Sequence, residues 1–345
     1  MRVAVLAHGK FPDRAKTAVG LLRHSDYEIE AVLDRENAGK QVSEFLPDVQ
    51  DAPIVAEMAD APEVDALIIG IAPIGGGFDE SWRSDVRNAL DRGCDLVSGL
   101  HYFLADDEEF ADLAAENDCD IWDVRKPHDD LGVAQGISGE VDAEVVLTVG
   151  TDCSVGKMTA TVELLEAAEE RGADVGFIPT GQTGIMIEGW GNPVDRVVSD
   201  FTAGSVEEMV VERGDDYDYL FVEGQGSIVH PAYSAVTCGI LHGSMADKLV
   251  LCHEAGREVV HGYEDFDLPP VPEYVDLYED LARPVHETEV VAGALNTKNV
   301  ADDAAAREAI AEFGEAIDAP ATDPVRFDGE EDGESGYDDV LEAIL

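Results

Sequence analysis

The sequence predicts an α/β protein of two domains, each built on a mostly parallel sheet flanked by helices. Three observations lead to this fold class. Short apolar runs typical of strands alternate with amphipathic helical segments along the whole chain. The length of 345 residues suits two domains of ordinary size. The pattern is also interrupted near the middle, at the polar connector "GISGEVDAE", so we expect domains at residues 1–138 and 139–345.

The first half carries five strand-like runs, each ending in a glycine or polar turn. In chain order they are "RVAVLAHG", "YEIEAVLD", "VDALIIGIAP", "DLVSGL" and "CDIWDV". A helical segment extends to about Arg23, and "DDEEFADLAAEN" predicts an acidic helix. In "SWRSDVRNALDRG", Trp82, Val86 and Leu90 recur at every fourth residue, which indicates one buried helix face. The glycine turn "IGGG" after the third strand and Asp34 after the second are weak signs of dinucleotide binding, because the GxGxxG fingerprint is missing.

The second half also alternates strand-like and helical segments, but its sequence does not repeat that of the first half. Strands are expected at 144–149, 173–178, 218–223, 247–252 and 288–295, and helices at 157–171, 204–213, 272–282 and 301–316. The proline-rich stretch "HGYEDFDLPPVPEYV" is expected to be a surface excursion. The acidic tail is expected to end in a short apolar helix.

Composition limits the classes of function. The formal net charge of −53 is spread along the chain, which is typical of the solvated surface of a halophilic protein. Nucleic acid is disfavoured as a partner because no basic stripe is present to neutralise phosphates. No apolar run is long enough to span a membrane and the N-terminus does not have the pattern of a signal peptide, so we expect a cytoplasmic protein. The five cysteines form no CxxC pair, which argues against a zinc site.

A phosphate-binding loop is the strongest single motif. The segment "VVLTVGTDCSVGKMT" places a glycine loop and a lysine between an apolar strand and a helix. Backbone N–H groups at a helix N-terminus favour an anion, and a lysine adds positive charge. The predicted cofactor-binding residues of the loop are Gly150, Thr151, Asp152, Cys153, Ser154, Val155, Gly156, Lys157, Met158 and Thr159.

The loop departs from the common pattern at the position that binds magnesium. The residue after the lysine normally supplies a hydroxyl to Mg²⁺, and here it is Met158. The nearest hydroxyl, on Thr159, lies roughly 100° further round the helix. We therefore expect phosphate binding without metal-assisted phosphoryl transfer, and we assign no metal ligand. A ligand that carries a diphosphate and needs no hydrolysis, such as coenzyme A, fits this change.

The loop, with five residues between its two glycines, resembles that of dethiobiotin synthetase and its P-loop relatives. Two further segments resemble the same group: "YLFVEGQGSIVHP", whose strand ends in Glu223, and "VVAGALNTK". The second resemblance implies that Asn296 reads the edge of an adenine base.

The whole chain resembles a family that pairs an N-terminal Rossmann-like domain with a C-terminal P-loop NTPase-like domain. The motifs that carry the resemblance are "GTDCSVGKMT", "PTGQTGIMI" and "VEGQGSIVHPAYS". Members of the family are D-glutamate N-acetyltransferases, which move acetyl from acetyl-CoA to the amine of D-glutamate. The resemblance implies an acyltransferase of D-amino acid metabolism, with acetyl-CoA as co-substrate and an acidic amino acid as substrate.

Such a reaction needs a base, donors for the oxyanion of the thioester and a clamp for the substrate carboxylates. Glu223, at the carboxyl end of a strand, is the candidate base, with a water- or Mg²⁺-holding role as its alternative. His230, in the glycine-rich loop after that strand, is a second catalytic candidate, and a structural role is its alternative. The substrate-binding candidates are Thr180, Gln182 and Thr183 of the "PTGQTG" loop, Arg196 as a bidentate clamp, and Lys10 of "AHGKF".

Two other classes of function stay open. One is a ligase or kinase of the dethiobiotin synthetase type, for which ATP and Mg²⁺ would be the cofactors. The other is a nucleotide-binding regulatory ATPase, which would dimerise with nucleotide and make no small product. Met158 counts against both. The sequence leaves open whether the chain forms a homo-oligomer.

Overall fold

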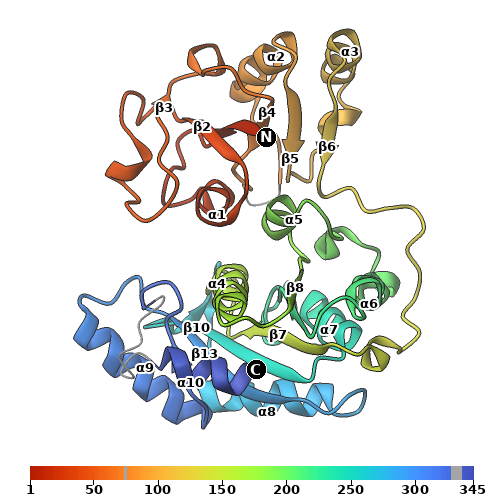
Figure 1. The fold of residues 1–345 in the computed structure, drawn as a ribbon, viewed down its shortest axis with the longest axis vertical. Helices are drawn as coiled ribbons and strands as arrows, with labels where there is room; N and C mark the ends of the chain where they lie inside the picture. Colours follow the sequence, from red (N-terminus) through yellow and green to blue (C-terminus); the bar gives the residue numbers. More distant parts are fainter. Residues whose placement is uncertain (74–75, 328–335) are drawn as a thin grey trace. The chain divides into compact units, whose positions relative to one another are not determined.

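The computed structural model describes residues 1–73, 76–327 and 336–345, which form two compact units (Figure 1). The first unit comprises Met1–Pro127 together with Gln182–Arg196. The second comprises His128–Gly181 together with Val197–Leu345. Each unit contains one six-stranded parallel sheet with helices against it, which confirms the predicted fold class.

The sheet of the first unit has the strand order β3-β2-β1-β4-β5-β6. Its strands are β1 (Arg2–Leu6), β2 (Glu28–Leu33), β3 (Ile54–Val55), β4 (Ala66–Ile69), β5 (Asp95–Ser98) and β6 (Ile121–Asp123). Its helices are α1 (Lys16–His24), α2 (Arg83–Asp91), α3 (Glu108–Asn117) and α5 (Gln182–Glu188). Strand β1 lies inside this sheet, and its residues from Val3 onward are fully buried, which explains the continuous apolar run. Trp82, Val86 and Leu90 are all buried, as their spacing predicts.

The sheet of the second unit has the strand order β14-β13-β10-β7-β9-β8. Its strands are β7 (Glu144–Gly150), β8 (Val175–Ile178), β9 (Tyr219–Val222), β10 (Lys248–Glu254), β13 (Glu289–Asn296) and β14 (Ala321–Thr322). A small antiparallel pair, β11 (Val259–Val260) and β12 (Tyr263–Asp267), lies apart from this sheet. The helices are α4 (Lys157–Glu170), α6 (Thr202–Arg213), α7 (Ser234–Ser244), α8 (Val271–Ala282), α9 (Asp303–Ile317) and α10 (Tyr337–Ile344). Because β7 has neighbours on both sides, the loop that follows it lies over the centre of the sheet's carboxyl edge.

The packing divides the chain differently from the predicted ranges 1–138 and 139–345. The segment after Pro127 belongs to the second unit, where the Glu207 carboxylate accepts hydrogen bonds from the backbone N–H groups of Gln135, Gly136 and Ile137. Residues 182–196 belong to the first unit because α5 packs against α1. The cause in both places is tertiary contact, which a change in sequence composition does not reveal.

Two segments have a different structure from the one expected. The "PTGQTG" stretch is not a loop throughout, since α5 begins at Gln182. Helix α7 was not among the predicted helices. A Cβ atom at Gly239 or Gly243 of α7 would lie 2.4 Å from a residue of α6, so these glycines allow two helices to approach closely. The proline-rich stretch was expected to be a surface excursion; it contains the exposed strand β12 and leads into α8, close to the helix expected at 272–282. Ile74 and Gly75 of the "IGGG" turn, and residues 328–335 of the acidic tail, lie outside the described residues.

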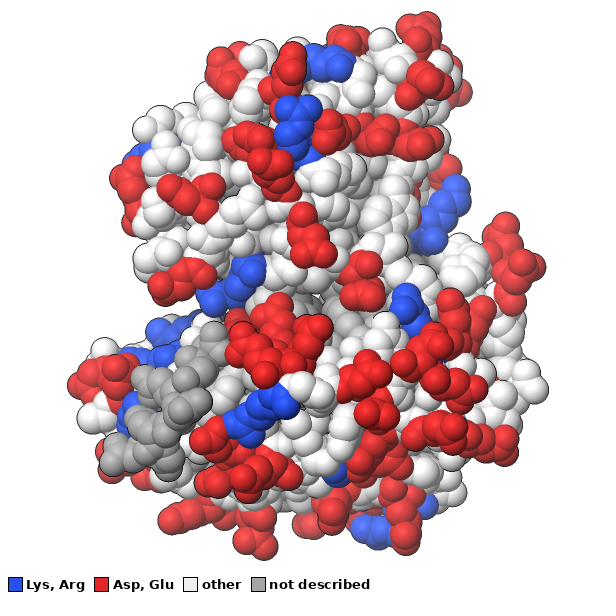
Figure 2. All heavy atoms as spheres, viewed as in Figure 1, with Lys and Arg blue, Asp and Glu red and all other residues white. Residues whose placement is uncertain are grey.

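Acidic side chains cover much of the visible face of both units, with few lysines and arginines between them (Figure 2). This agrees with the distribution of Asp and Glu along the whole chain. Among the described residues, none of the helices has the length and apolar character needed to cross a membrane.

Candidate functional site

The predicted phosphate loop joins the carboxyl end of β7 to the N-terminus of α4. Ser154 and Gly156 adopt left-handed backbone conformations, with φ of 57° and 108°. Such residues in a turn let successive N–H groups converge on one point, as anion-binding nests require. Lys157 is the first residue of α4, and its Nζ donates to the carbonyl oxygen of Asp152 at 2.8 Å. The geometry is that of a phosphate-binding loop at a helix N-terminus.

The loop is held by side chains from other segments of the second unit. Ser227 Oγ donates to the Thr151 carbonyl oxygen at 3.0 Å. The Thr151 hydroxyl lies 2.7 Å from Nδ1 of His253, on β10. Burial, and then the nearby Arg257 guanidinium, lower the pKa of His253 to about 4, so the ring is neutral near pH 7. These braces were not predicted, since each comes from a residue far away in sequence.

Asp152 is completely buried and does not face solvent. Its carboxylate accepts from the backbone N–H of Cys153 at 2.7 Å and from that of His261 at 2.7 Å. It also forms an ion pair of 3.2 Å with Arg257. Asp152 therefore fixes the conformation of the loop through buried hydrogen bonds, and the Arg257 guanidinium compensates its negative charge.

Glu223, the candidate base, follows β9 and is 6% exposed. Its Oε2 accepts from the backbone N–H groups of Thr180 and Gly181 at 3.1 and 3.0 Å. Gly224 follows directly, and a Cβ atom there would lie 1.7 Å from the Thr148 carbonyl oxygen. The strand end therefore holds Glu223 and Thr180 together beside β7.

Asn296, the last residue of β13, lies beside the phosphate loop. Its Nδ2 is 3.5 Å from the Val155 carbonyl oxygen, and a Cβ atom on Gly156 would lie 3.6 Å from the same nitrogen. A hollow of about 620 Å³ opens nearby, and its lining includes Arg257, His261 and Asn299. Since Arg257 and His261 both contact Asp152, this hollow adjoins the loop.

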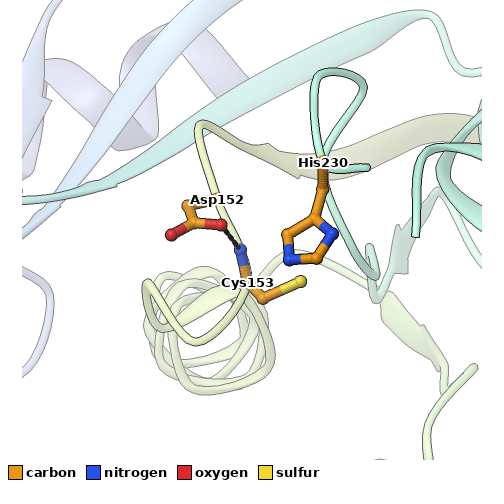
Figure 3. Close-up of side chains that lie close together, drawn as sticks. All are labelled: Asp152, Cys153 and His230. Atoms are coloured by element: carbon orange, nitrogen blue, oxygen red, sulfur yellow. Dashed lines mark hydrogen bonds between the residues drawn. The ribbon is translucent and has the colours of Figure 1, made fainter. Parts of the chain in front are cut away.

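His230 lies close to the loop residues Asp152 and Cys153 (Figure 3). A side-chain oxygen, sulfur and nitrogen from these three residues lie within 4.8 Å of one another. His230 is buried, and its ring contacts those of Tyr233 and Tyr263. The sequence analysis singled out Asp152 and Cys153 in the phosphate loop and His230 in another loop. It did not predict that these two loops bring the three side chains together.

The remaining predicted substrate residues belong to the first unit. The Thr183 hydroxyl lies 2.9 Å from that of Thr17, and the Gln182 amide oxygen accepts from Arg125. The Arg196 guanidinium lies over the ring of Phe103, 5.3 Å from its centroid. Lys10 lies in the turn after β1. The "PTGQTG" motif is thus divided between the two units. Thr180 belongs to the second unit, and Gln182 and Thr183 belong to the first.

The positions after the lysine were predicted to distinguish this loop from that of a magnesium-dependent enzyme. Met158 and Thr159 are both partly buried in the first turn of α4. The hydroxyl that contacts the sheet belongs to Thr161, which lies 2.8 Å from the Thr148 hydroxyl. The glycine turn and the lysine of the P-loop motif are therefore present, while Met158, the residue after the lysine, has no side-chain oxygen.

Comparison with known proteins agrees with this division into two folds. Residues 35–127 match the family model described as the DUF1611_N Rossmann-like domain, and residues 132–332 match the DUF1611_C P-loop domain. Proteins named D-glutamate N-acetyltransferase are similar over most of the chain. The one from Tritonibacter scottomollicae is 37% identical over 78% of this chain and 80% of its own. The one from a Pseudoalteromonas species is 33% identical over 75% and 77%.

A solved structure extends the match to nearly the full length. The crystal structure of a DUF1611 family protein from Anabaena variabilis has a TM-score of 0.92 and 41% identity, covering 99% of this chain and 98% of its own. The chain described here belongs to the DUF1611 family, with its Rossmann-like N-terminal domain and its P-loop C-terminal domain.

Proposed function

We propose that the protein is an N-acetyltransferase that moves acetyl from acetyl-CoA to the amine of D-glutamate or a similar acidic D-amino acid. The observation that carries the proposal is the similarity, at 33–37% identity over three quarters of the chain, to two proteins named for this activity. The protein would act in D-amino acid metabolism, as those names imply.

In this proposal the loop Gly150–Lys157 holds phosphates of coenzyme A. The left-handed turns at Ser154 and Gly156, with Lys157, support an anion there, and Asn296 with the adjoining hollow supports a nucleoside. Transfer of acetyl from a thioester requires no cleavage of a phosphate ester. The methionine at position 158 is consistent with a loop that binds phosphate without presenting a magnesium ligand.

The chemical step joins the amine nitrogen to the carbonyl carbon of the thioester and breaks the carbon–sulfur bond. The ammonium group of the substrate must first lose one proton to a base. The nitrogen loses a second proton as the amide forms, and this proton neutralises the departing thiolate of the coenzyme. Glu223 is our candidate for the base, because two backbone N–H groups hold its carboxylate at the carboxyl end of β9. Thr180, Gln182, Thr183, Arg196 and Lys10 remain the candidates for binding the substrate.

The proposal is tested by thiol release from acetyl-CoA in molar KCl, which screens the charge of −53. D-glutamate, L-glutamate and no amino acid are compared in parallel. Thiol release that depends on D-glutamate is the expected result. Release without an amino acid would indicate only a thioesterase, and equal release with both enantiomers would remove the D-specific part of the proposal.

The P-loop fold itself favours a second candidate, an ATP-dependent ligase or kinase acting on a small acid. It requires Mg²⁺ to be held without a hydroxyl at position 158. Absence of thiol release, together with substrate-dependent ADP formation from Mg-ATP, would support this candidate and contradict acetyl transfer. ATP turnover with no added acid would instead indicate the regulatory ATPase.

A further inference from the structure

A buried histidine nitrogen faces the phosphate loop without a hydrogen-bond partner. His230 is 1% exposed, and within the described part of the chain its Nε2 has no acceptor or donor in reach. Figure 3 shows the ring turned with one nitrogen toward Cys153 and Asp152 and the other toward its own loop. Buried polar groups in folded proteins are almost always hydrogen-bonded, so an unpaired one beside an anion-binding loop indicates a ligand partner.

The second ring nitrogen determines which atom carries the proton. Nδ1 of His230 accepts a hydrogen bond of 3.1 Å from the backbone N–H of Ala232. A neutral imidazole has one donor and one acceptor nitrogen. Because Nδ1 accepts a hydrogen bond from the Ala232 N–H, it carries a lone pair and no proton. In the neutral ring the proton therefore lies on Nε2. The backbone of the same turn is fixed by hydrogen bonds from His230 N to the Ser227 carbonyl and from Ser234 N to the His230 carbonyl.

This tautomer argues against two other roles for the cluster of Asp152, Cys153 and His230. A metal ion would need the lone pair of Nε2, and the other nitrogen of a metal-bound histidine donates to an acceptor. A cysteine–histidine nucleophile pair needs the same lone pair to take the thiol proton, with the other nitrogen again a donor. The N–H of Ala232 occupies the position where either role needs an acceptor.

We infer that His230 is a neutral donor whose Nε2–H binds an anionic oxygen of the ligand held at the loop. Asp152 is not the acceptor, because Nε2 makes no hydrogen bond within the described residues and the Asp152 carboxylate is bonded instead to Arg257 and to two backbone N–H groups. The positive charge of Lys157 lies on the same loop. The oxygen belongs to a phosphate of the coenzyme or to a carboxylate of the amino acid, two sources with the same acceptor chemistry. The inference rests on the ligand classes of the proposed function.

The tautomer is tested without any ligand or activity. Long-range ¹H–¹⁵N correlation spectra of the full chain, labelled at histidine and kept in molar KCl at pH 8, separate the two neutral tautomers. His230→Gln identifies the signal by its loss. The expected pattern is a protonated Nε2 and an unprotonated Nδ1. A protonated Nδ1 would overturn the inference even if the enzyme proves to be an acetyltransferase.

The donor role is tested by calorimetric titration with coenzyme A, inorganic pyrophosphate and D-glutamate in separate arms. His230→Phe keeps a ring but has no donor, and His230→Gln keeps an N–H donor. The matched control is His242→Phe, since Nε2 of His242 is already bonded to the Leu281 carbonyl at 2.9 Å. We expect His230→Phe to weaken binding in one arm about tenfold to a hundredfold, the loss of a hydrogen bond to a charged oxygen, and His230→Gln to weaken it less.

The arm that responds identifies the source of the oxygen. Weaker binding of coenzyme A and pyrophosphate assigns it to a phosphate, and weaker binding of D-glutamate alone assigns it to a carboxylate. Unchanged affinity in all three arms, or no binding of any of the three probes by the wild-type chain, would overturn the inference. Binding of pyrophosphate alone that depends on His230 would support the donor while removing the proposed acetyltransferase substrates.

Discussion

The hydroxyl of Tyr278 donates a hydrogen bond of 2.7 Å to the carbonyl oxygen of Gly150, the last residue of β7. The same hydroxyl accepts from the backbone N–H of Ile228 at 3.2 Å. Tyr278 is fully buried on α8, and burial raises its pKa far above the usual range, so the donor is always protonated. One side chain thus ties the start of the phosphate loop to the loop that carries His230.

We predict that Tyr278→Phe destabilises the protein by about 1 kcal/mol or more, because the buried Gly150 carbonyl and the partly buried Ile228 N–H both lose this partner. The matched control is Tyr274→Phe on the same helix. Tyr274 is also fully buried, but its hydroxyl has no hydrogen-bond partner among the described residues, so its removal should be neutral or slightly stabilising. Urea unfolding of the two variants in molar KCl measures the difference. Equal losses of stability would show that the Tyr278 bonds contribute nothing specific.

A pH-dependent part of the stability is expected from His253. Its pKa is about 4 in the folded chain and about 6.5 in an unfolded one. Between these values the unfolded chain binds a proton that the folded ring does not, so the free energy of unfolding falls as the pH falls from 7 to 4. The contribution is on the order of 1–3 kcal/mol.

His253→Gln isolates this contribution, since the amide can still bond the Thr151 hydroxyl but does not titrate. Unfolding free energies at pH 7 and pH 5 are compared between the variant and the wild type at constant KCl. The wild type should lose more stability than the variant over this interval. The same loss in both proteins would mean that other groups, such as the many carboxylates, account for it.

Met158→Thr returns a hydroxyl to the position after Lys157. We predict that Mg²⁺ then increases the affinity for ATP several-fold, because the hydroxyl can bind the metal beside the phosphates. Binding of a fluorescent ATP analogue with and without Mg²⁺ measures the effect, and Met158→Val serves as the control without an oxygen. A wild-type chain that already binds ATP with strong Mg²⁺ dependence would contradict our interpretation of the methionine.

Glu223→Gln tests the candidate base. The amide oxygen can still accept from Thr180 and Gly181, so folding should be largely retained, while the rate of acetyl transfer should fall about a hundredfold. Glu207→Gln is the control, since Glu207 is equally buried, accepts three backbone N–H groups and has no proposed chemical role. If both variants retain the wild-type rate, the base is another group.

Much of the P-loop domain could be predicted because its signals are local. Helix α4 was expected at 157–171 and spans Lys157–Glu170, and Glu223 was expected at a strand end and follows β9 directly. A buried strand, a glycine turn and a helical period each depend on residues close together in sequence. The halves of "PTGQTG" could not be placed in this way, because packing of α5 against α1 decides to which unit Gln182 belongs.

The sequence by itself determined the fold class, the phosphate loop and the absence of a side-chain hydroxyl after Lys157, because these depend only on residue type and spacing. Only the tertiary structure decided what surrounds the loop. Tyr278 reaches Gly150 from 128 residues away, and His253 reaches Thr151 from 102 residues away. The proton position on His230 follows from a turn that closes on Ala232. Contacts of this kind arise from packing and hydrogen-bond satisfaction in the folded chain, and no local pattern encodes them.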